Sequence, residues 1–192
     1  NNWGQPRLNI SNYEDTGSLR KRCIRKDCQF DGVLLTDLKE KIVTLKKRKK
    51  FVVLHTAGSH GPTYYKKYPK SFEFFKPVCK SVDISSCTQK ELINAYDNSI
   101  LYTDHVISET IKTLKQIDIP SVLIYISDHG ESLGEFGLYL HGTPYSIAPD
   151  FQKDIPFLLW QSKNSNSKNK LQKTALSTEN DYGHFNIFHT IL

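Results

Sequence analysis

An acid, an imidazole and a second acid follow one another directly after an apolar, β-branched run. In the stretch LIYISDHGESLGEFGLYLHG these residues are Asp128, His129 and Glu131, and His141 closes the stretch. A further histidine, His60, comes just after another apolar run, in HTAGSHGP. Carboxylate oxygens together with several imidazole nitrogens are a ligand set that suits zinc. The pattern therefore predicts a metal site, and it favours this over a Ser-His-Asp hydrolase because no G-x-S-x-G motif is present.

Four predicted elements would place these side chains at one end of the fold. The apolar runs 51–56 (FVVLHT), 121–127 (SVLIYIS) and 155–160 (IPFLLW) are typical of short buried strands. Between the first two lies a predicted long helix, 88–114, which opens with a Thr-x-x-Glu capping box. A strand, a helix and a strand in this order form a βαβ unit, so we predict an α/β fold with a mostly parallel sheet flanked by helices. Ligands bind beyond the carboxyl ends of such strands, which is where the acids and histidines lie.

The rest of the chain carries weaker signals. Residues 1–32 show no dominant periodicity and are interpreted as a loop, while 33–47 have apolar residues at helical spacing and predict an amphipathic helix. The polar run 161–170 is interpreted as a surface loop.

The four cysteines form two close pairs in polar, loop-like sequence. Cys23 and Cys28 make one pair, and Cys79 and Cys87 make the other. Neither pair is a C-x-x-C motif or has histidines at zinc-finger spacing. We predict two local disulfides and hence an oxidising compartment such as the periplasm or the cell exterior. The alternative is four free thiols in a cytosolic protein, but free cysteines usually lie among apolar residues.

The chain has 192 residues, which suits one domain, and a formal net charge of +6. A basic surface indicates an anionic partner, such as nucleic acid, an anionic membrane face or a phosphate-bearing substrate. We expect no nucleic acid partner, because no nucleic-acid-binding signature accompanies the KKRKK run at 46–50. No stretch approaches the length of a membrane span. The chain contains no methionine, and we interpret it as a fragment whose targeting elements lie upstream.

Three blocks of the sequence resemble one known family, in the same order along the chain. They are VLHTAGSHGPTYYKKYP, AYDNSILYTDHVI and SDHGESLGEFGLYLHGTPYSIAPDFQKDIPFLLW. These blocks closely resemble the phosphoethanolamine transferases of the Gram-negative envelope, in the sulfatase-like branch of the alkaline phosphatase superfamily. The resemblance runs from about residue 51 to residue 160, and the closing HFNIFHTIL also looks like the family's C-terminal region. Residues 1–50 resemble the family loosely, mainly through the cysteine pair.

The resemblance implies an alkaline phosphatase-like α/β fold and a zinc-dependent transferase at the periplasmic face of the inner membrane. Such enzymes have a membrane-anchored N-terminal domain and a periplasmic catalytic domain. They move phosphoethanolamine from phosphatidylethanolamine onto lipid A or another envelope acceptor. A threonine attacks the donor phosphorus and forms a phospho-threonine intermediate, and Zn²⁺ lowers the pKa of this nucleophile.

The family's site residues carry over onto matching positions of this chain. Asp128 and His129 match ligands of the principal zinc. His60 and His141 match two histidines at a second metal or phosphate position. Glu131 matches an acid near the ethanolamine group, where a carboxylate pairs with the ammonium. Among the cysteines, the pair Cys79 and Cys87 matches one family disulfide, and the pair Cys23 and Cys28 is interpreted as another.

The main departure from the family is the absence of a recognisable nucleophile. Neither Thr16 nor Thr36 has the expected strand-to-helix context, and no glutamate completes the principal zinc site. We therefore interpret 1–192 as the C-terminal portion of one sulfatase-like catalytic domain, with the membrane domain, the threonine and the glutamate upstream. As a fragment it is expected to be inactive.

Other interpretations remain open on the sequence alone. The chain could belong to another enzyme of the superfamily, a phosphoglycerol transferase or a sulfatase, or it could be a non-catalytic periplasmic binding module. His55 and His105 are interpreted as structural. His184 and His189 lie near the C-terminal end, and His184 is a candidate, though not the favoured interpretation, for the edge of the site. The tyrosines at 64, 65 and 68, with Lys66 and Lys67, either line an acceptor groove or form a solvated loop.

Overall fold

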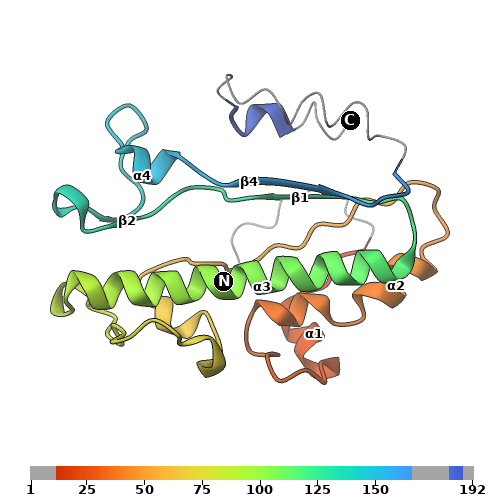
Figure 1. Cartoon of the computed structure of the whole chain (residues 1–192), viewed down its shortest axis with the longest axis horizontal. Helices are drawn as coiled ribbons and strands as arrows, with labels where there is room; N and C mark the ends of the chain where they lie inside the picture. Colours follow the sequence, from red (N-terminus) through yellow and green to blue (C-terminus); the bar gives the residue numbers. More distant parts are fainter. Residues whose placement is uncertain (1–11, 166–181, 188–192) are drawn as a thin grey trace.

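A long helix, α3 (Gln89–Ile117), crosses the whole molecule in the computed structural model, which describes residues 12–165 and 182–187 (Figure 1). The predicted capping box is confirmed: Thr88 Oγ accepts from the Glu91 N–H, and Glu91 Oε2 accepts from the Thr88 N–H. The helix ends at Asp118, which adopts a left-handed backbone conformation with φ of 54°. One face of α3 is buried along most of its length, through Leu92, Ala95, Tyr102 and Val106.

Two strands lie on one side of α3 and form an antiparallel pair (Figure 1). They are β1 (Val122–Ile126) and β4 (Phe157–Gln161), paired so that Ile124 faces Leu159. A second small sheet joins β2 (Ser132–Leu133) to β3 (Tyr139–Leu140). Both predicted strands at 121–127 and 155–160 are confirmed, and the α/β class holds. The expected parallel pairing is wrong for the sheet that the structure describes.

The third predicted strand is also wrong. Residues 51–56 form no strand, and the side chains of Phe51 and Val53 are about 70% exposed. In the view of Figure 1 this segment passes between α3 and the sheet as an extended trace. An apolar, β-branched run favours extended backbone but does not specify a hydrogen-bonding partner. The parallel pairing follows only if 51–56 is a strand beside 121–127, so the two errors have one cause.

The N-terminal region is more helical than predicted. Within 1–32, α1 (Thr16–Arg22) begins where the Asp15 side chain accepts a hydrogen bond from the Ser18 N–H, which satisfies one free amide of the first turn. The predicted helix 33–47 is divided into η1 (Asp31–Leu35) and α2 (Leu38–Thr44). The division falls at Asp37, whose φ of 55° interrupts right-handed helical geometry.

Short helical turns build the connections between these elements. They are η2 (Tyr64–Lys66), η3 (Lys70–Phe72), η4 (Ile84–Ser86), η5 (Glu135–Gly137) and α4 (Asp150–Lys153). The buried side chain of Asn98 on α3 holds one of these connections: its amide oxygen accepts from the backbone N–H groups of Phe74 and Phe75, and its Nδ2 donates to the Phe75 carbonyl.

The core consists of two clusters packed on α3. One contains Tyr64, Cys79, Leu92, Ala95 and Leu133, and the other contains Tyr68, Tyr102 and Val106. Tyr64 and Tyr68 are therefore core residues, and neither proposed role for them, an acceptor groove or a solvated loop, is correct. Tyr64 is only 1% exposed.

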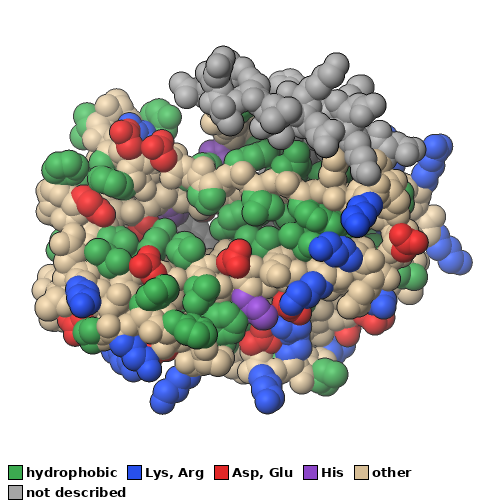
Figure 2. All heavy atoms as spheres, viewed as in Figure 1, with side chains coloured by type: hydrophobic (Ala, Val, Ile, Leu, Met, Phe, Trp, Pro, Cys, Tyr) green, Lys and Arg blue, Asp and Glu red, His purple; other side chains and the backbone are tan. Residues whose placement is uncertain are grey.

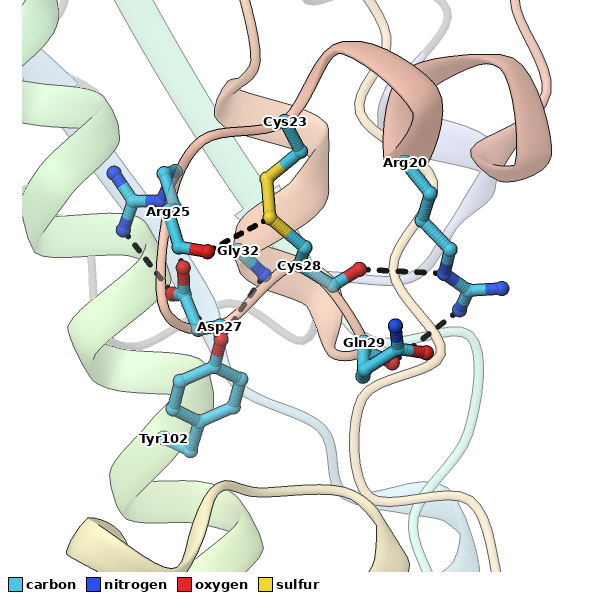
Figure 3. Close-up of a disulfide and its surroundings, with 8 residues drawn as sticks. All are labelled: Arg20, Cys23, Arg25, Asp27, Cys28, Gln29, Gly32 and Tyr102. Carbon is cyan, nitrogen blue, oxygen red and sulfur yellow. Dashed lines mark hydrogen bonds and ion pairs between the residues drawn. A yellow bond between two sulfur atoms is a disulfide. The ribbon is translucent and has the colours of Figure 1, made fainter.

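Both predicted disulfides are confirmed, and one of them holds a polar network against α3. Cys23 bonds to Cys28, and Cys79 bonds to Cys87. Beside the first bridge, Arg25 binds the Asp27 carboxylate through Nε at 2.8 Å and Nη2 at 3.1 Å (Figure 3). Tyr102 of α3 donates its hydroxyl proton to Asp27 and accepts from the Gly32 N–H. Burial alone would raise the pKa of Asp27, but its hydrogen bonds from Arg25 and Tyr102 hold that pKa below its usual value.

The outer surface carries a band of apolar side chains. Figure 2 shows hydrophobic groups gathered in the middle of one face, between the sheet and α3. Residues of β1, β4 and 51–56 are among the exposed apolar ones, including Val122, Phe157 and Leu158. Among the described residues, none of the helices combines the length and the apolar character needed to cross a membrane.

The capping box makes the start of α3 a measurable contribution to stability. We expect Thr88→Ala to lower the free energy of unfolding by about 1 kcal/mol, because the first turn loses an N-cap acceptor. Thr88→Ser, which keeps the hydroxyl, should stay close to the wild type. Denaturant titration checks both variants, and equal stability of Thr88→Ala and the wild type would contradict a role for the cap.

The Asp27 network should make stability depend on pH. Because the folded pKa of Asp27 is lowered, its stabilisation is present above the unfolded pKa of about 3.9 and is lost as the pH falls through the folded pKa. We expect Asp27→Asn to cost about 1 to 3 kcal/mol at pH 7, and the difference from the wild type to shrink below about pH 4.

Asp104→Asn is the control, because Asp104 is exposed. Thermal melting at a series of pH values measures both variants. A deficit in Asp27→Asn that stays constant down to pH 2 would show that the network does not act through the ionised carboxylate.

Candidate functional site

Three of the predicted histidines meet in space. His60 lies in the turn after 51–56, His129 follows β1, and His141 follows β3. The ring centroids of His129 and His141 are 3.8 Å apart, and His60 lies 5.2 Å from His141 and 6.4 Å from His129. Loops that are far apart in sequence thus bring together the imidazoles that we predicted as metal ligands. We call these three residues the histidine cluster.

Backbone carbonyls set the tautomer of two of these rings. His60 Nδ1 lies 2.8 Å from the Gly61 carbonyl oxygen, and His129 Nδ1 lies 2.7 Å from that of Gly130. A carbonyl oxygen can only accept, so each Nδ1 carries the proton and donates it. In the neutral ring Nε2 is then left with a free lone pair, which is the form that binds a metal ion.

The Glu131 carboxylate sets the tautomer of the third ring, that of His141. Its Oε1 lies 3.0 Å from His141 Nδ1, and its Oε2 accepts a longer bond, 3.4 Å, from the Gly61 N–H. The side chain of Glu131 is only 4% exposed. Burial and, second, the charge of Glu131 raise the pKa of the neighbouring Tyr64 hydroxyl, which therefore stays protonated.

Asp128 contrasts with Glu131 in its exposure. Its side chain is 86% exposed, and its Oδ1 accepts from the backbone N–H of His129 at 3.1 Å. The same oxygen lies 3.8 Å from His129 Nε2. Asp128 is therefore accessible to a ligand from solvent.

The turn that carries Asp128 and His129 is braced by contacts that we did not predict from the sequence. Ser127 Oγ donates to the His129 carbonyl, and the Gly130 N–H donates to the Gln152 carbonyl. A Cβ atom at Gly130 would lie 2.1 Å from the Phe151 carbonyl oxygen, so the chain passes where a side chain does not fit. The glycine after the Asp-His pair was the only signal of this close approach.

Gln152 joins three segments around that turn. Its side chain is buried, with Nε2 donating to Ser132 Oγ at 3.0 Å and Oε1 accepting from the Thr143 N–H at 3.3 Å. A single glutamine in a polar stretch has no pattern that would single it out, and sequence reasoning missed it.

The other described histidines, at 55, 105 and 184, lie outside the histidine cluster. His184 lies at the edge of the site, where its Nε2 is 2.8 Å from the Ser127 carbonyl oxygen. His105 packs against Phe72 and Tyr102, away from the cluster. His55 is exposed rather than buried in a strand. His189 lies outside the described residues.

The donor set fits a metal ion in its chemistry, because it combines three imidazoles, each hydrogen-bonded through Nδ1, with an accessible carboxylate. Across residues 12–165 and 182–187, however, no group of three or more His, Cys, Asp or Glu side chains is arranged to hold a metal ion.

Similar proteins are named as phosphoethanolamine transferases. The chain is 46% identical over 180 residues to the phosphoethanolamine transferase EptA of Salmonella typhimurium, covering 91% of this chain and 32% of that protein. It is 38% identical over 154 residues to the Kdo(2)-lipid A phosphoethanolamine 7''-transferase of the same organism, covering 80% and 26%. The chain thus spans about a third of the length of such relatives.

Solved structures show the same relationship. The integral membrane protein lipooligosaccharide phosphoethanolamine transferase A of Neisseria meningitidis matches with a TM-score of 0.77 and 40% identity, covering 89% of this chain and 33% of that one. The C-terminal periplasmic domain of EptC from Escherichia coli, in complex with Zn, matches with a TM-score of 0.60 and 26% identity, covering 77% and 41%.

These matches confirm the sulfatase-like fold that the sequence blocks implied. The sulfatase family model matches residues 3–192, which is nearly the whole chain. The chain belongs to the sulfatase family.

Proposed function

We propose that the protein transfers phosphoethanolamine from phosphatidylethanolamine to lipid A or another envelope acceptor. The observation that carries this proposal is the meeting of His60, His129 and His141 beside Asp128. The names of similar proteins support the same proposal. Relatives at 38% to 46% identity are named as phosphoethanolamine transferases, and the name of one of them includes lipid A.

We further propose that residues 1–192 are the C-terminal portion of a catalytic domain at the periplasmic face of the inner membrane, with a membrane domain upstream. Three findings support this. The chain covers about a third of its relatives, one solved relative is an integral membrane protein, and another is a periplasmic domain. Two disulfides also suit an oxidising compartment.

In the proposed site Asp128 and His129 hold a principal Zn²⁺, and His60 and His141 serve a second metal or phosphate position. When bound, zinc would supply a Lewis acid that lowers the pKa of a nucleophilic hydroxyl and offsets phosphoryl charge. A zinc complex of one relative supports the choice of metal. The nucleophile is proposed to be a threonine upstream of Asn1, which forms a phospho-threonine intermediate.

The residues of this chain prepare the site by fixing imidazole orientation. The carbonyls of Gly61 and Gly130 keep the protons of His60 and His129 on Nδ1. Glu131 keeps the His141 proton on Nδ1 and links the loops of Gly61 and His141. Its nearly buried carboxylate favours this positioning role. The ethanolamine contact that we expected for Glu131 stays a prediction.

Removing a principal ligand should abolish both metal binding and transfer. We expect His129→Ala and Asp128→Ala in the full-length protein to lose near-stoichiometric zinc and to reduce transfer by more than about 100-fold, since even outer contacts of a metal site cost 10- to 100-fold. Elemental analysis and transfer of phosphoethanolamine to lipid A measure the two effects.

The matched control is His55→Ala, because His55 is exposed and outside the histidine cluster. Full transfer by Asp128→Ala would refute the mechanism. Unchanged zinc content in His129→Ala would show that the metal ion is not bound at this turn. Function that survives both substitutions would favour a non-catalytic binding module.

The role of Glu131 can be separated from a substrate contact. We expect Glu131→Gln to weaken zinc binding by about 10- to 100-fold, because the amide is a weaker acceptor for the His141 Nδ1 proton. Competition with a chelator measures the affinity. The control is Glu135→Gln, two positions past the last residue of β2, Leu133. Unchanged zinc affinity with a raised KM for the donor would instead assign Glu131 to the ethanolamine.

A further inference from the structure

A cationic pocket lies beside the middle of α3, at His105, outside the histidine cluster. It has a volume of about 440 Å³, and its lining includes Arg25, Lys26, Asp27, Lys70, Phe72 and His105. Figure 2 shows a histidine beside both basic and acidic side chains below the middle of α3. The proposed transferase site uses none of these residues.

The charges facing the pocket are mainly positive. Lys26 and Lys70 are exposed, and neither makes an ion pair or side-chain hydrogen bond within the described residues. Asp27 is already bound by Arg25 and by the Tyr102 hydroxyl. The other nearby carboxylate, Glu109, pairs with Lys112 at 2.6 Å. Within the part of the chain that the structure describes, two lysines therefore line the pocket without a partner, whereas both neighbouring acids have one.

The wall that carries Arg25 is held rigidly. The Cys23–Cys28 bridge closes its loop, and Arg20 binds the carbonyls of Cys28 and Gln29 at 3.2 and 3.3 Å (Figure 3). Arg25 has five N–H donors, and its two bonds to Asp27 leave the others available. A guanidinium held in this way recognises phosphate oxygens with little loss of side-chain entropy.

Aromatic rings form another side of the pocket. Phe72 and His105 have ring centroids 4.9 Å apart, and His105 is stacked on Tyr102 at 5.9 Å and 27°. Phe72 and His105 line the pocket beside the cations, and their rings suit the apolar portion of a ligand that also bears a phosphate.

We propose that this pocket binds a phosphomonoester group, with Lys26, Lys70 and the free N–H groups of Arg25 as the donors. Free phosphate and a lipid headgroup that ends in a phosphate share this chemistry. The inference does not rest on the proposed transferase activity, because it uses neither the histidine cluster nor a bound metal ion.

The test measures phosphate binding by the full-length protein carrying His129→Ala, which reduces competing binding at the histidine cluster. Inorganic phosphate is titrated by calorimetry. In a second arm, co-sedimentation measures binding to phosphatidylethanolamine vesicles with and without phosphatidic acid. The variant is the double substitution Lys26→Gln and Lys70→Gln. The control, Lys46→Gln with Lys49→Gln, removes the same charge from the basic run at 46–50.

We expect the double variant to bind inorganic phosphate at least about ten-fold more weakly, as for lost hydrogen bonds between charged groups, while the control binds like the wild type. Loss in both arms assigns the pocket to phosphomonoesters in general. Loss only with phosphatidic acid vesicles assigns it to a lipid headgroup. Equal binding by variant and control, or no binding to either probe by the starting protein, would overturn the proposal.

Discussion

The geometry of the histidine cluster depends on the buried carboxylate of Glu131. A carboxylate that is almost fully removed from water is strongly destabilising unless hydrogen-bond donors surround it. The donors here are the Gly61 N–H and His141 Nδ1, which belong to two loops separated by about eighty residues of sequence. Satisfying one charge therefore holds both loops together, and His60 and His141 are brought close as a result.

Helix α3 supplies the second fixed reference for the same loops. Ser99 Oγ lies 2.8 Å from Ser59 Oγ, directly before His60, and the Asp31 carboxylate accepts from the N–H groups of Ala57 and Gly58. The 57–60 turn is thus attached to the helix and to the N-terminal region although 51–56 forms no strand. Hydrogen bonds from side chains replace the support that a sheet would have given.

The features that were predicted correctly from the sequence are those that depend on residues close together in the chain. The capping box at Thr88 and the two disulfides depend on residues close in the chain, and all were predicted correctly. The gathering of His60, His129 and His141 was also anticipated, although through a parallel pairing that the sheet does not have. Pairing direction, the burial of Tyr64 and the bracing by Gln152 depend on contacts between distant segments, for which one sequence contains no pattern.

The two disulfides join cysteines that are close in sequence, and this favours their formation over the other possible pairings. Four cysteines allow three connectivities, and the native one closes loops of 5 and 8 residues. The other two would each join the first cysteine pair to the second, across more than about fifty residues. Because each tenfold increase in loop length costs roughly 2 kcal/mol of chain entropy, the unfolded chain already favours the native bridges. Correct oxidation therefore requires no prior tertiary structure and little reshuffling.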